Sequence, residues 1–259
     1  MRLTIDATLD YHFETPTDVL LALEVAQLPD QLLVQDQLTV SSAAPLTPVD
    51  GQESIGRRTW AAAEGDFIAR YTAIVDVERP LPDLAKVQAP PLRSLPGLVI
   101  PFLWPSRYCR SDKLRDFAVG TFGTLQGGAQ ALAIADWVRA NIVYTPGSSD
   151  EDTTSADTFL QRQGICRDFA HLMISFARAL GMPARMVSAY AWQLDPPDFH
   201  AVVEVYLDGG WYLVDPTGLA PIEGLARIGI GRDAAEISFM TIFGTGRLRS
   251  QRVTVERVG

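Results

Sequence analysis

One stretch of the chain combines a glycine, a cysteine and an apolar pattern with helical spacing: Gly-Ile-Cys-Arg-Asp-Phe-Ala-His-Leu-Met, residues 164–173. The apolar side chains that recur three and four residues apart, as on one buried helix face, are Phe169, Leu172, Met173, Phe176 and Leu180. Gly181 and Pro183 are typical of the end of such a helix. Cys166 would then lie in the first turn, where free backbone N–H groups and the helix dipole favour a thiolate. This placement suits a nucleophile, although a cysteine can also simply fill a core.

The composition describes an ordinary globular protein and argues against several functions. The chain has 259 residues, 47% of them hydrophobic and 20% charged, which is enough for one large domain or two. Its net charge of −9 argues against a nucleic-acid partner. No signal peptide or membrane span is visible and the two cysteines make no disulfide framework, so we expect a cytoplasmic protein without a membrane partner. The histidines and cysteines are too scattered for a metal site, and no other cofactor is expected.

The first hundred residues predict short strands. Residues 3–13 alternate apolar and polar side chains, which is typical of a half-buried strand with His12 on its wet face. Residues 19–25, 32–40 and 67–77 predict further strands, with turn residues between the runs. Strands at this spacing favour an antiparallel sandwich of about a hundred residues.

A proline-rich segment that ends near residue 105 follows these strands. Its content of large apolar side chains predicts a belt packed on the protein rather than a free tether. We therefore divide the chain into a β-rich N-terminal domain, residues 1–105, and a second domain, residues 106–259.

The second domain predicts helices followed by strands. Helical signals cover residues 112–118 and, after Gly127-Gly128, a stronger helix up to Ile142. An acidic loop, residues 148–157, precedes the cysteine helix. Strand-like runs then occupy residues 184–192, 199–207, 211–214 and 247–258. Helices that precede an antiparallel sheet make an α+β layout rather than a doubly wound one.

A cysteine nucleophile needs a base and a group that orients the base, and His200 and Asp215 are the candidates. They flank a predicted hairpin whose turn is Asp208-Gly209, a favoured two-residue turn. Pairing that starts at Leu207 and Gly210 makes His200 and Asp215 diagonal neighbours on one face of the sheet. A three-residue loop would put them on opposite faces, so the assignment depends on this register.

Two residues closer to the cysteine are weaker candidates for its partner. His171 follows Cys166 by five residues, about 140° round the helix, so it would point elsewhere. Asp168, about 200° away, fits better as a first-turn carboxylate favoured by the helix dipole. Taken singly, His200 could also be a hydrogen-bonded core histidine, and Asp215 a turn carboxylate before a proline.

Four short blocks stand in order along the second domain: residues 164–172, residues 178–185 (Arg-Ala-Leu-Gly-Met-Pro-Ala-Arg), residues 198–201 (Asp-Phe-His-Ala) and residues 215–217 (Asp-Pro-Thr). In these blocks the chain resembles the bacterial transglutaminase-like superfamily. The resemblance implies a papain-like α+β core after a β-rich N-terminal region. It also implies Cys166 as the nucleophile, His200 as the base and Asp215 as the orienting group.

This resemblance, together with the triad, predicts acyl transfer at an amide bond through a thioester on Cys166, with a peptide or protein amide as the substrate. The calcium-binding and barrel domains of animal transglutaminases have no counterpart in the sequence. We therefore expect water as the acceptor, as in a cysteine protease or amidase. A protein-glutamine transglutaminase and a non-catalytic interaction module that keeps the fold are the alternatives.

Three aromatic residues are further candidates near the triad. Tyr144, just before the acidic loop, could supply an oxyanion donor beside the Cys166 backbone N–H, or could be an ordinary half-buried aromatic residue. Trp192 and Trp211 could form walls of the substrate cleft, although core packing is the simpler interpretation of both. The sequence predicts no oligomeric state.

Overall fold

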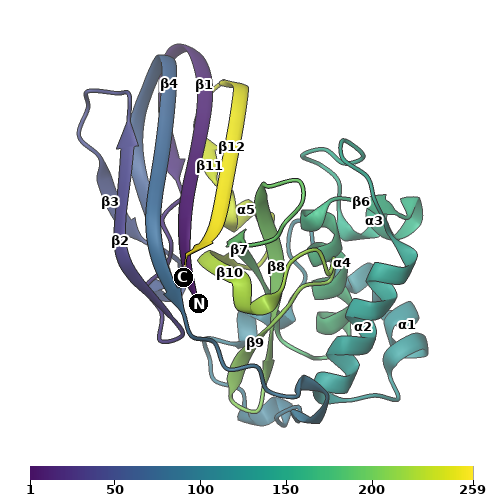
Figure 1. Ribbon diagram of the computed structural model, residues 1–259. Helices are drawn as coiled ribbons and strands as arrows, with labels where there is room; N and C mark the ends of the chain where they lie inside the picture. Colours follow the sequence, from purple (N-terminus) through teal and green to yellow (C-terminus); the bar gives the residue numbers. More distant parts are fainter. Residues whose placement is uncertain (259) are drawn as a thin grey trace.

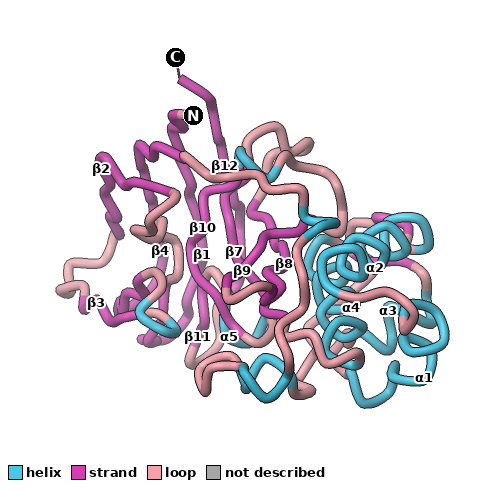
Figure 2. The backbone as a smooth tube through the Cα atoms, turned by 90° about the horizontal axis from the view of Figure 1, so that it is seen from below, coloured by secondary structure: helices cyan, strands magenta, loops and turns pink. Residues whose placement is uncertain are grey.

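The computed structural model describes residues 1–258 and has an α+β fold made of two antiparallel sheets and a group of helices (Figure 1). In Figure 1 the larger sheet stands on the left, the smaller sheet in the middle, and most of the helices on the right. Figure 2 shows the same separation from below, with the helices gathered on one side of the strands. The predicted α+β fold class is confirmed.

The larger sheet takes strands from both ends of the chain. Its strands are β1 (Arg2–Leu21), β2 (Gln31–Val40), β3 (Thr47–Asp50), β4 (Arg57–Val77), β11 (Met240–Ile242) and β12 (Arg247–Val258). The order is β11–β1–β4–β2, with β12 also paired to β1 and β3 to β4. The predicted final strand, residues 247–258, thus lies beside residues 2–12 of the first strand. The division of the chain at residue 105 remains a prediction.

β1 is longer than the sequence pattern predicted. The alternation indicated two strands, residues 3–13 and 19–25, but the structure has one continuous strand from Arg2 to Leu21. The register of pairing with β4 shifts between Phe13 and Thr17, where the alternation is interrupted. Pairing continues on both sides of this shift, so one strand replaces the two that were predicted. His12 lies on the exposed face as predicted, with its Nδ1 2.7 Å from Asp66 Oδ1.

The smaller sheet carries His200 and ends just before Asp215, the two predicted partners of Cys166. Its strands are β7 (Ala184–Ala191), β8 (Phe199–Leu207), β9 (Gly210–Val214) and β10 (Leu225–Gly231), in the order β10–β7–β8–β9. β5 (Val143–Tyr144) and β6 (Gln163–Gly164) form a separate short parallel pair.

Five α-helices complete the second half of the chain: α1 (Ser111–Phe122), α2 (Gly127–Asn141), α3 (Ser155–Gln161), α4 (Cys166–Ala179) and α5 (Ala234–Ile237), within the described residues 1–258. Short 3-10 turns lie at Gln52–Ser54, Leu84–Lys86, Leu92–Ser94, Ile100–Leu103 and Ile222–Gly224. α4 is the central helix: every residue from Asp168 to Ala179 is buried. It packs against α1, α2 and α3 on one side and against β7 and β8 on the other.

The two sheets pack face to face and share one apolar core. Leu3, Ile5 and Tyr71 of the larger sheet meet Tyr190 and Phe199 of the smaller sheet in this core. The second layer of the predicted sandwich is therefore the smaller sheet, and not further strands from the first hundred residues. The apolar face of β1 and β4 must be buried against another layer, and strands of the smaller sheet, which are distant in sequence, pack on it.

The proline-rich segment packs on the second half of the chain, as its composition predicted. The 3-10 turn Leu84–Lys86 lies against α2, and Phe102 is buried with its ring 5.3 Å from that of Trp211. The segment therefore connects the two sheets along a packed path.

Candidate active site

Cys166 begins α4 at a point where three segments meet. In the β5–β6 pair Tyr144 lies opposite Gly164, and the chain passes from there into the helix. Asp168 Oδ2 accepts a hydrogen bond from the Ile165 N–H at 2.9 Å. The Asp168 side chain fills the space that a Cβ on Gly164 would need, so only glycine fits there. Asp168 therefore closes the first turn, as the sequence predicted.

The β8–β9 hairpin has the predicted register. Asp208 and Gly209 have φ angles of 43° and 78°, both in the left-handed region that a type I′ turn requires. The paired residues start on either side of this turn and continue to Val214. As a result, His200 Nε2 lies 3.0 Å from Asp215 Oδ2, with both side chains buried.

Four donors hold the Asp215 carboxylate. Oδ1 accepts the backbone N–H of Thr217 at 2.9 Å and its hydroxyl at 2.7 Å. Oδ2 accepts the Ala220 N–H at 3.2 Å as well as the His200 ring. Burial would raise the pKa of Asp215, but the hydrogen bonds and the charge of His200 outweigh it and lower the pKa below its usual value. Asp215 is therefore ionised near neutral pH.

The second ring nitrogen of His200 is available for the thiol. Nδ1 is buried and makes no hydrogen bond within residues 1–258. Burial alone would lower the pKa of His200, but Asp215 and the Cys166 thiol both interact with the ring and raise the pKa to about 10. Because Asp215 occupies Nε2, Nδ1 is the nitrogen that remains for the sulfur. The ring is thus an imidazolium at neutral pH.

Tyr144 lies beside the same sulfur. Burial raises the pKa of its hydroxyl to about 12, and the charge of Cys166 contributes in the same direction. The Cys166 backbone N–H also interacts with the phenol oxygen. The ring packs on Phe169 with 5.9 Å between centroids, while 39% of the residue stays exposed. The hydroxyl and the backbone N–H therefore meet at the start of α4.

Comparison with known proteins connects this geometry to a family. A model described as the transglutaminase-like superfamily core matches residues 117–216, the segment that holds Cys166, His200 and Asp215. A solved structure from Cytophaga hutchinsonii, described as a proposed cysteine protease, is 35% identical, covers 99% of this chain and 90% of its own, and superimposes with a TM-score of 0.92. The chain belongs to the transglutaminase-like superfamily.

Two mycobacterial relatives match the transglutaminase-like chain over part of its length. An uncharacterised protein of Mycobacterium leprae is 32% identical over 128 residues, which are 45% of this chain and 44% of that protein. One of Mycobacterium bovis is 28% identical over 102 residues, which are 39% of this chain and 32% of that protein. The match thus spans less than half the length of these curated relatives.

His171 and Cys109 lie outside the predicted triad. The His171 ring is fully buried, stacks on Tyr108 at 5.1 Å, and accepts the Ala234 N–H at Nε2. Burial lowers the pKa of His171 to about 3, so the ring is neutral. Cys109 is fully buried as well, and burial raises the pKa of its thiol to about 12. Both residues belong to the packing around α4.

Trp192 and Trp211 lie in two different surroundings. Trp192 follows β7 and lies at the core between the sheets, 5.8 Å from the Arg257 guanidinium. Trp211 packs on Phe102 and lines a cavity of about 1080 Å³ between β9, α2 and the proline-rich segment. Asp215 borders this cavity, but neither the thiol nor the imidazole does. Packing, the alternative considered for both tryptophans, matches these positions.

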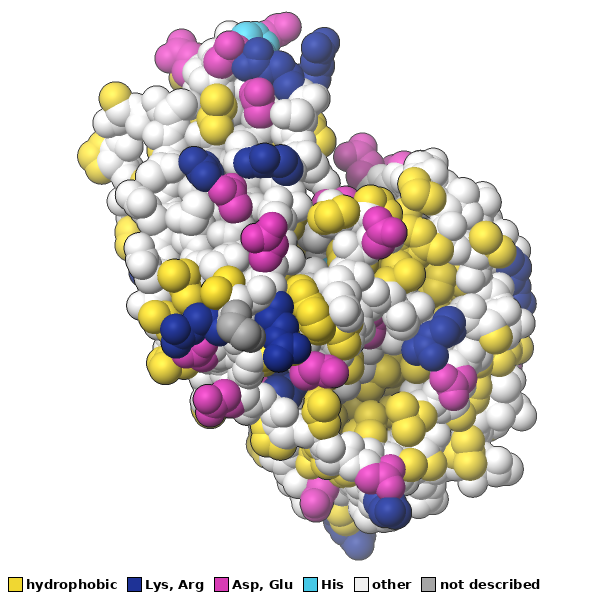
Figure 3. Space-filling view, in the orientation of Figure 1, with side chains coloured by type: hydrophobic (Ala, Val, Ile, Leu, Met, Phe, Trp, Pro, Cys, Tyr) yellow, Lys and Arg dark blue, Asp and Glu magenta, His cyan; other side chains and the backbone are white. Residues whose placement is uncertain are grey.

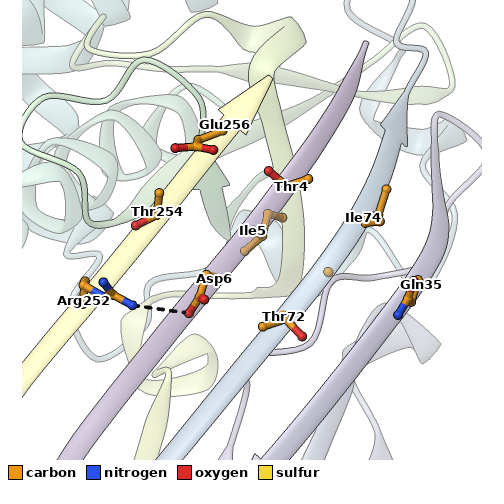
Figure 4. A pocket seen from close by; sticks show the side chains of 10 residues that line it. Thr4, Ile5, Asp6, Gln35, Thr72, Ile74, Arg252, Thr254 and Glu256 are labelled. Carbon is orange, nitrogen blue, oxygen red and sulfur yellow. Dashed lines mark ion pairs between the residues drawn. The ribbon is translucent and has the colours of Figure 1, made fainter. Parts of the chain in front are cut away.

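Another hollow, of about 510 Å³, lies on the outer face of the larger sheet (Figure 4). Strand side chains such as Thr4 and Thr72 line it, and Arg252 pairs with Asp6 across it at 4.0 Å. It contains no cysteine or histidine, so it lacks the nucleophile and the base of the predicted triad. Over residues 1–258 no cluster of histidine, cysteine or acidic side chains is arranged to hold a metal ion. None of the described helices is long and apolar enough to cross a membrane.

Sequence reasoning assigned no role to three residues that the structure places at the triad. Thr217 follows Asp215 by two residues. An aspartate side chain often accepts a hydrogen bond from the backbone N–H two residues later, so the sequence could have predicted this contact. Ala220 contributes only a backbone N–H, which any residue except proline has, so its identity in the sequence does not predict this contact. Asp198 stands two residues before His200 and interacts with both His200 and Tyr144.

Proposed function

We propose that the protein catalyses cysteine-dependent acyl transfer at an amide bond, with Cys166 as the nucleophile, His200 as the acid and base, and Asp215 as the residue that orients His200. One observation carries the proposal: the buried His200 ring has Asp215 on Nε2 and no hydrogen-bond partner on Nδ1 among residues 1–258, which leaves Nδ1 for the neighbouring Cys166 thiol. A histidine that only filled a core would be neutral, as His171 is.

The first half-reaction forms a thioester. The Cys166 thiolate attacks the carbonyl carbon of the substrate amide and forms a C–S bond. The Nδ1–H of His200 then donates its proton to the departing nitrogen while the C–N bond breaks. Asp215, held by Thr217 and Ala220, keeps the ring in the orientation that this transfer needs.

The second half-reaction releases the acyl group to water. His200, now neutral, takes a proton from a water molecule whose oxygen attacks the thioester carbonyl. The C–S bond breaks, a carboxylic acid leaves, and the thiolate and imidazolium are restored. The Cys166 backbone N–H and the Tyr144 hydroxyl are the donors that stabilise the oxyanion in both steps, because they meet beside the sulfur.

Two measurements test this proposal. Brief treatment with iodoacetamide near neutral pH should alkylate Cys166 much faster than Cys109, since Cys109 is fully buried. Peptide mapping identifies the labelled residue. Equal labelling of the two thiols, or faster labelling of Cys109, would remove the nucleophile assignment.

The second measurement identifies the acceptor. The protein is incubated with a glutamine-containing peptide and an excess of a primary amine, and the masses of the products are measured by mass spectrometry. We expect mainly the free acid and a transient acyl adduct on Cys166, neither of which forms in the Cys166→Ala variant. A product that is mainly the amine adduct would make the protein a transglutaminase, and no product with any peptide would favour a non-catalytic role.

A further inference from the structure

Asp198 is an acidic residue at the thiol end of β8 to which the proposed reaction gives no role. It precedes His200 by two residues, so the two Cα atoms are about 7 Å apart in extended chain. The charge of Asp198 is close enough to interact with those of His200 and Tyr144. The carboxylate therefore lies near the groups that surround the sulfur.

One oxygen of this carboxylate is held and the other is free. Oδ1 accepts the Phe199 N–H and the Gln251 Nε2–H, each at 2.7 Å. Oδ2 makes no hydrogen bond or ion pair with any residue in the range 1–258. Asp198 is exposed to solvent, and Oδ2 is the oxygen left for a ligand. The orientation of the carboxylate is nevertheless fixed, because Phe199 and Gln251 both donate hydrogen bonds to Oδ1.

Acidic side chains outnumber basic ones in the loops near the thiol, where Arg107 pairs with Asp152 at 3.7 Å. Residues 150–152 form a run of three acids in the loop beside the start of α4, and Asp195 lies in the loop that leads to Asp198. The nearby Arg167 is engaged by Asp168 and by the Asp150 carbonyl oxygen. Figure 3 shows acidic side chains where the upper strands meet the helical half of the molecule. This charge distribution attracts cationic ligands and repels anionic ones.

We propose that Asp198 is a specificity-determining residue that binds a positively charged nitrogen of the peptide substrate, next to the acyl group that reacts with Cys166. The inference rests on the proposed function and names its substrate class: peptides with a basic side chain or a free amino terminus near the reacting carbonyl. A free carboxylate oxygen with further acidic side chains nearby can bind such a positively charged nitrogen. Partial burial raises the pKa of Asp198 above its usual value, and a bound cation would offset that effect.

Gln251 gives the N-terminal sheet a part in this selection. It belongs to β12, which pairs with β1, and its amide is the group from the larger sheet that bonds Asp198. Gln251 is therefore a positioning residue, which acts on the substrate only through the carboxylate.

The test uses peptides that carry an acyloxymethyl ketone, whose carboxylate leaving group is displaced by the Cys166 sulfur. Matched probes have lysine or norleucine at each of the three positions nearest the ketone, and a second set has a free or an acetylated amino terminus. In the wild-type protein the cationic probes should label Cys166 about fivefold faster than their neutral partners, the effect of one partly exposed ion pair. The two sets distinguish a side-chain cation from a terminal one.

Asp198→Asn keeps the shape and one oxygen acceptor, so the ratio of labelling rates should fall to about one while the neutral probes react as before. Gln251→Ala should lower the same ratio partially. Asp208→Asn is the matched control, because it removes the same charge at the far end of β8 from a turn that accepts asparagine. That variant should keep the wild-type ratio. Unchanged thermal unfolding midpoints show that each variant is folded.

The outcomes separate the two proposals. Equal labelling by lysine and norleucine probes in the wild-type protein would overturn the role of Asp198 and leave Cys166 as the nucleophile. An Asp198→Asn variant that slows every probe by the same factor would also overturn it, since Asp198 would then act on His200 rather than on the substrate. If no probe labels Cys166 at all, the proposed function fails, and this inference fails with it.

Discussion

His200 and Asp215 are joined across the β8–β9 hairpin by a contact of 3.0 Å between Nε2 and Oδ2. The contact depends on a turn of two residues, because one more residue would move Asp215 to the other face of the sheet. The same hairpin leaves Nδ1 of His200 without a hydrogen-bond partner among residues 1–258. The type I′ turn at Asp208 and Gly209 therefore sets the register in which the His200 ring bonds Asp215 through one nitrogen and leaves the other nitrogen for Cys166.

Changing Asp215 to asparagine should lower turnover without unfolding the protein. The asparagine keeps the shape but can favour the wrong ring tautomer of His200. In serine enzymes the equivalent change costs about 10⁴ in turnover, and we expect a smaller loss here because a thiol needs less help from a base than a serine hydroxyl does. Steady-state kinetics measures the loss, and Thr217→Val, which removes one of the four donors to the carboxylate, should cost less. Full activity of Asp215→Asn would contradict the orienting role.

Changing His200 to alanine should abolish turnover and slow the alkylation of Cys166. His171→Ala is the matched control: it removes a ring that stacks on Tyr108, so it should cost stability, about 1–3 kcal/mol, more than rate. Chemical denaturation and alkylation kinetics on both variants give the comparison. If His171→Ala lost the thiol reactivity and His200→Ala kept it, the two assignments would have to be exchanged.

Removing the Tyr144 hydroxyl tests the oxyanion donor. Tyr144→Phe should lower kcat by about 10²-fold with little change in KM, as expected for a donor that acts in the transition state. The ring contact with Phe169 remains in this variant, so folding should be unaffected. A change in KM alone would make Tyr144 a substrate-binding residue instead.

The pKa of His200 predicts how stability depends on pH. Folding raises this pKa from 6.5 to about 10, because Asp215 and Cys166 hold the proton despite burial. The contribution to stability is therefore complete below about pH 6.5 and is lost as the pH rises towards 10. Denaturant unfolding from pH 6 to pH 10 should show this decline in the wild-type protein. The His200→Ala variant should lack it, and the same decline in that variant would place its origin elsewhere.

Local patterns were sufficient for the parts of the site that one segment controls. The spacing of Phe169, Leu172 and Met173 predicts the central helix with Cys166 in its first turn, and the structure has α4 starting at that residue. The Asp208-Gly209 turn predicts the register that brings His200 to Asp215. These features follow from the sequence because each depends on side-chain periodicity or turn chemistry within a few residues.

Tertiary structure decided everything that depends on which distant segments pair. β12 joins β1, the smaller sheet covers the larger one, and Gln251 reaches Asp198. Tyr144 reaches the sulfur only through the pairing of β5 with β6. The alternation in β12 shows that it is a strand, but any open sheet edge with an apolar face could accept it. Its partner is selected by the apolar area that the whole fold buries, and no short stretch of sequence contains that information.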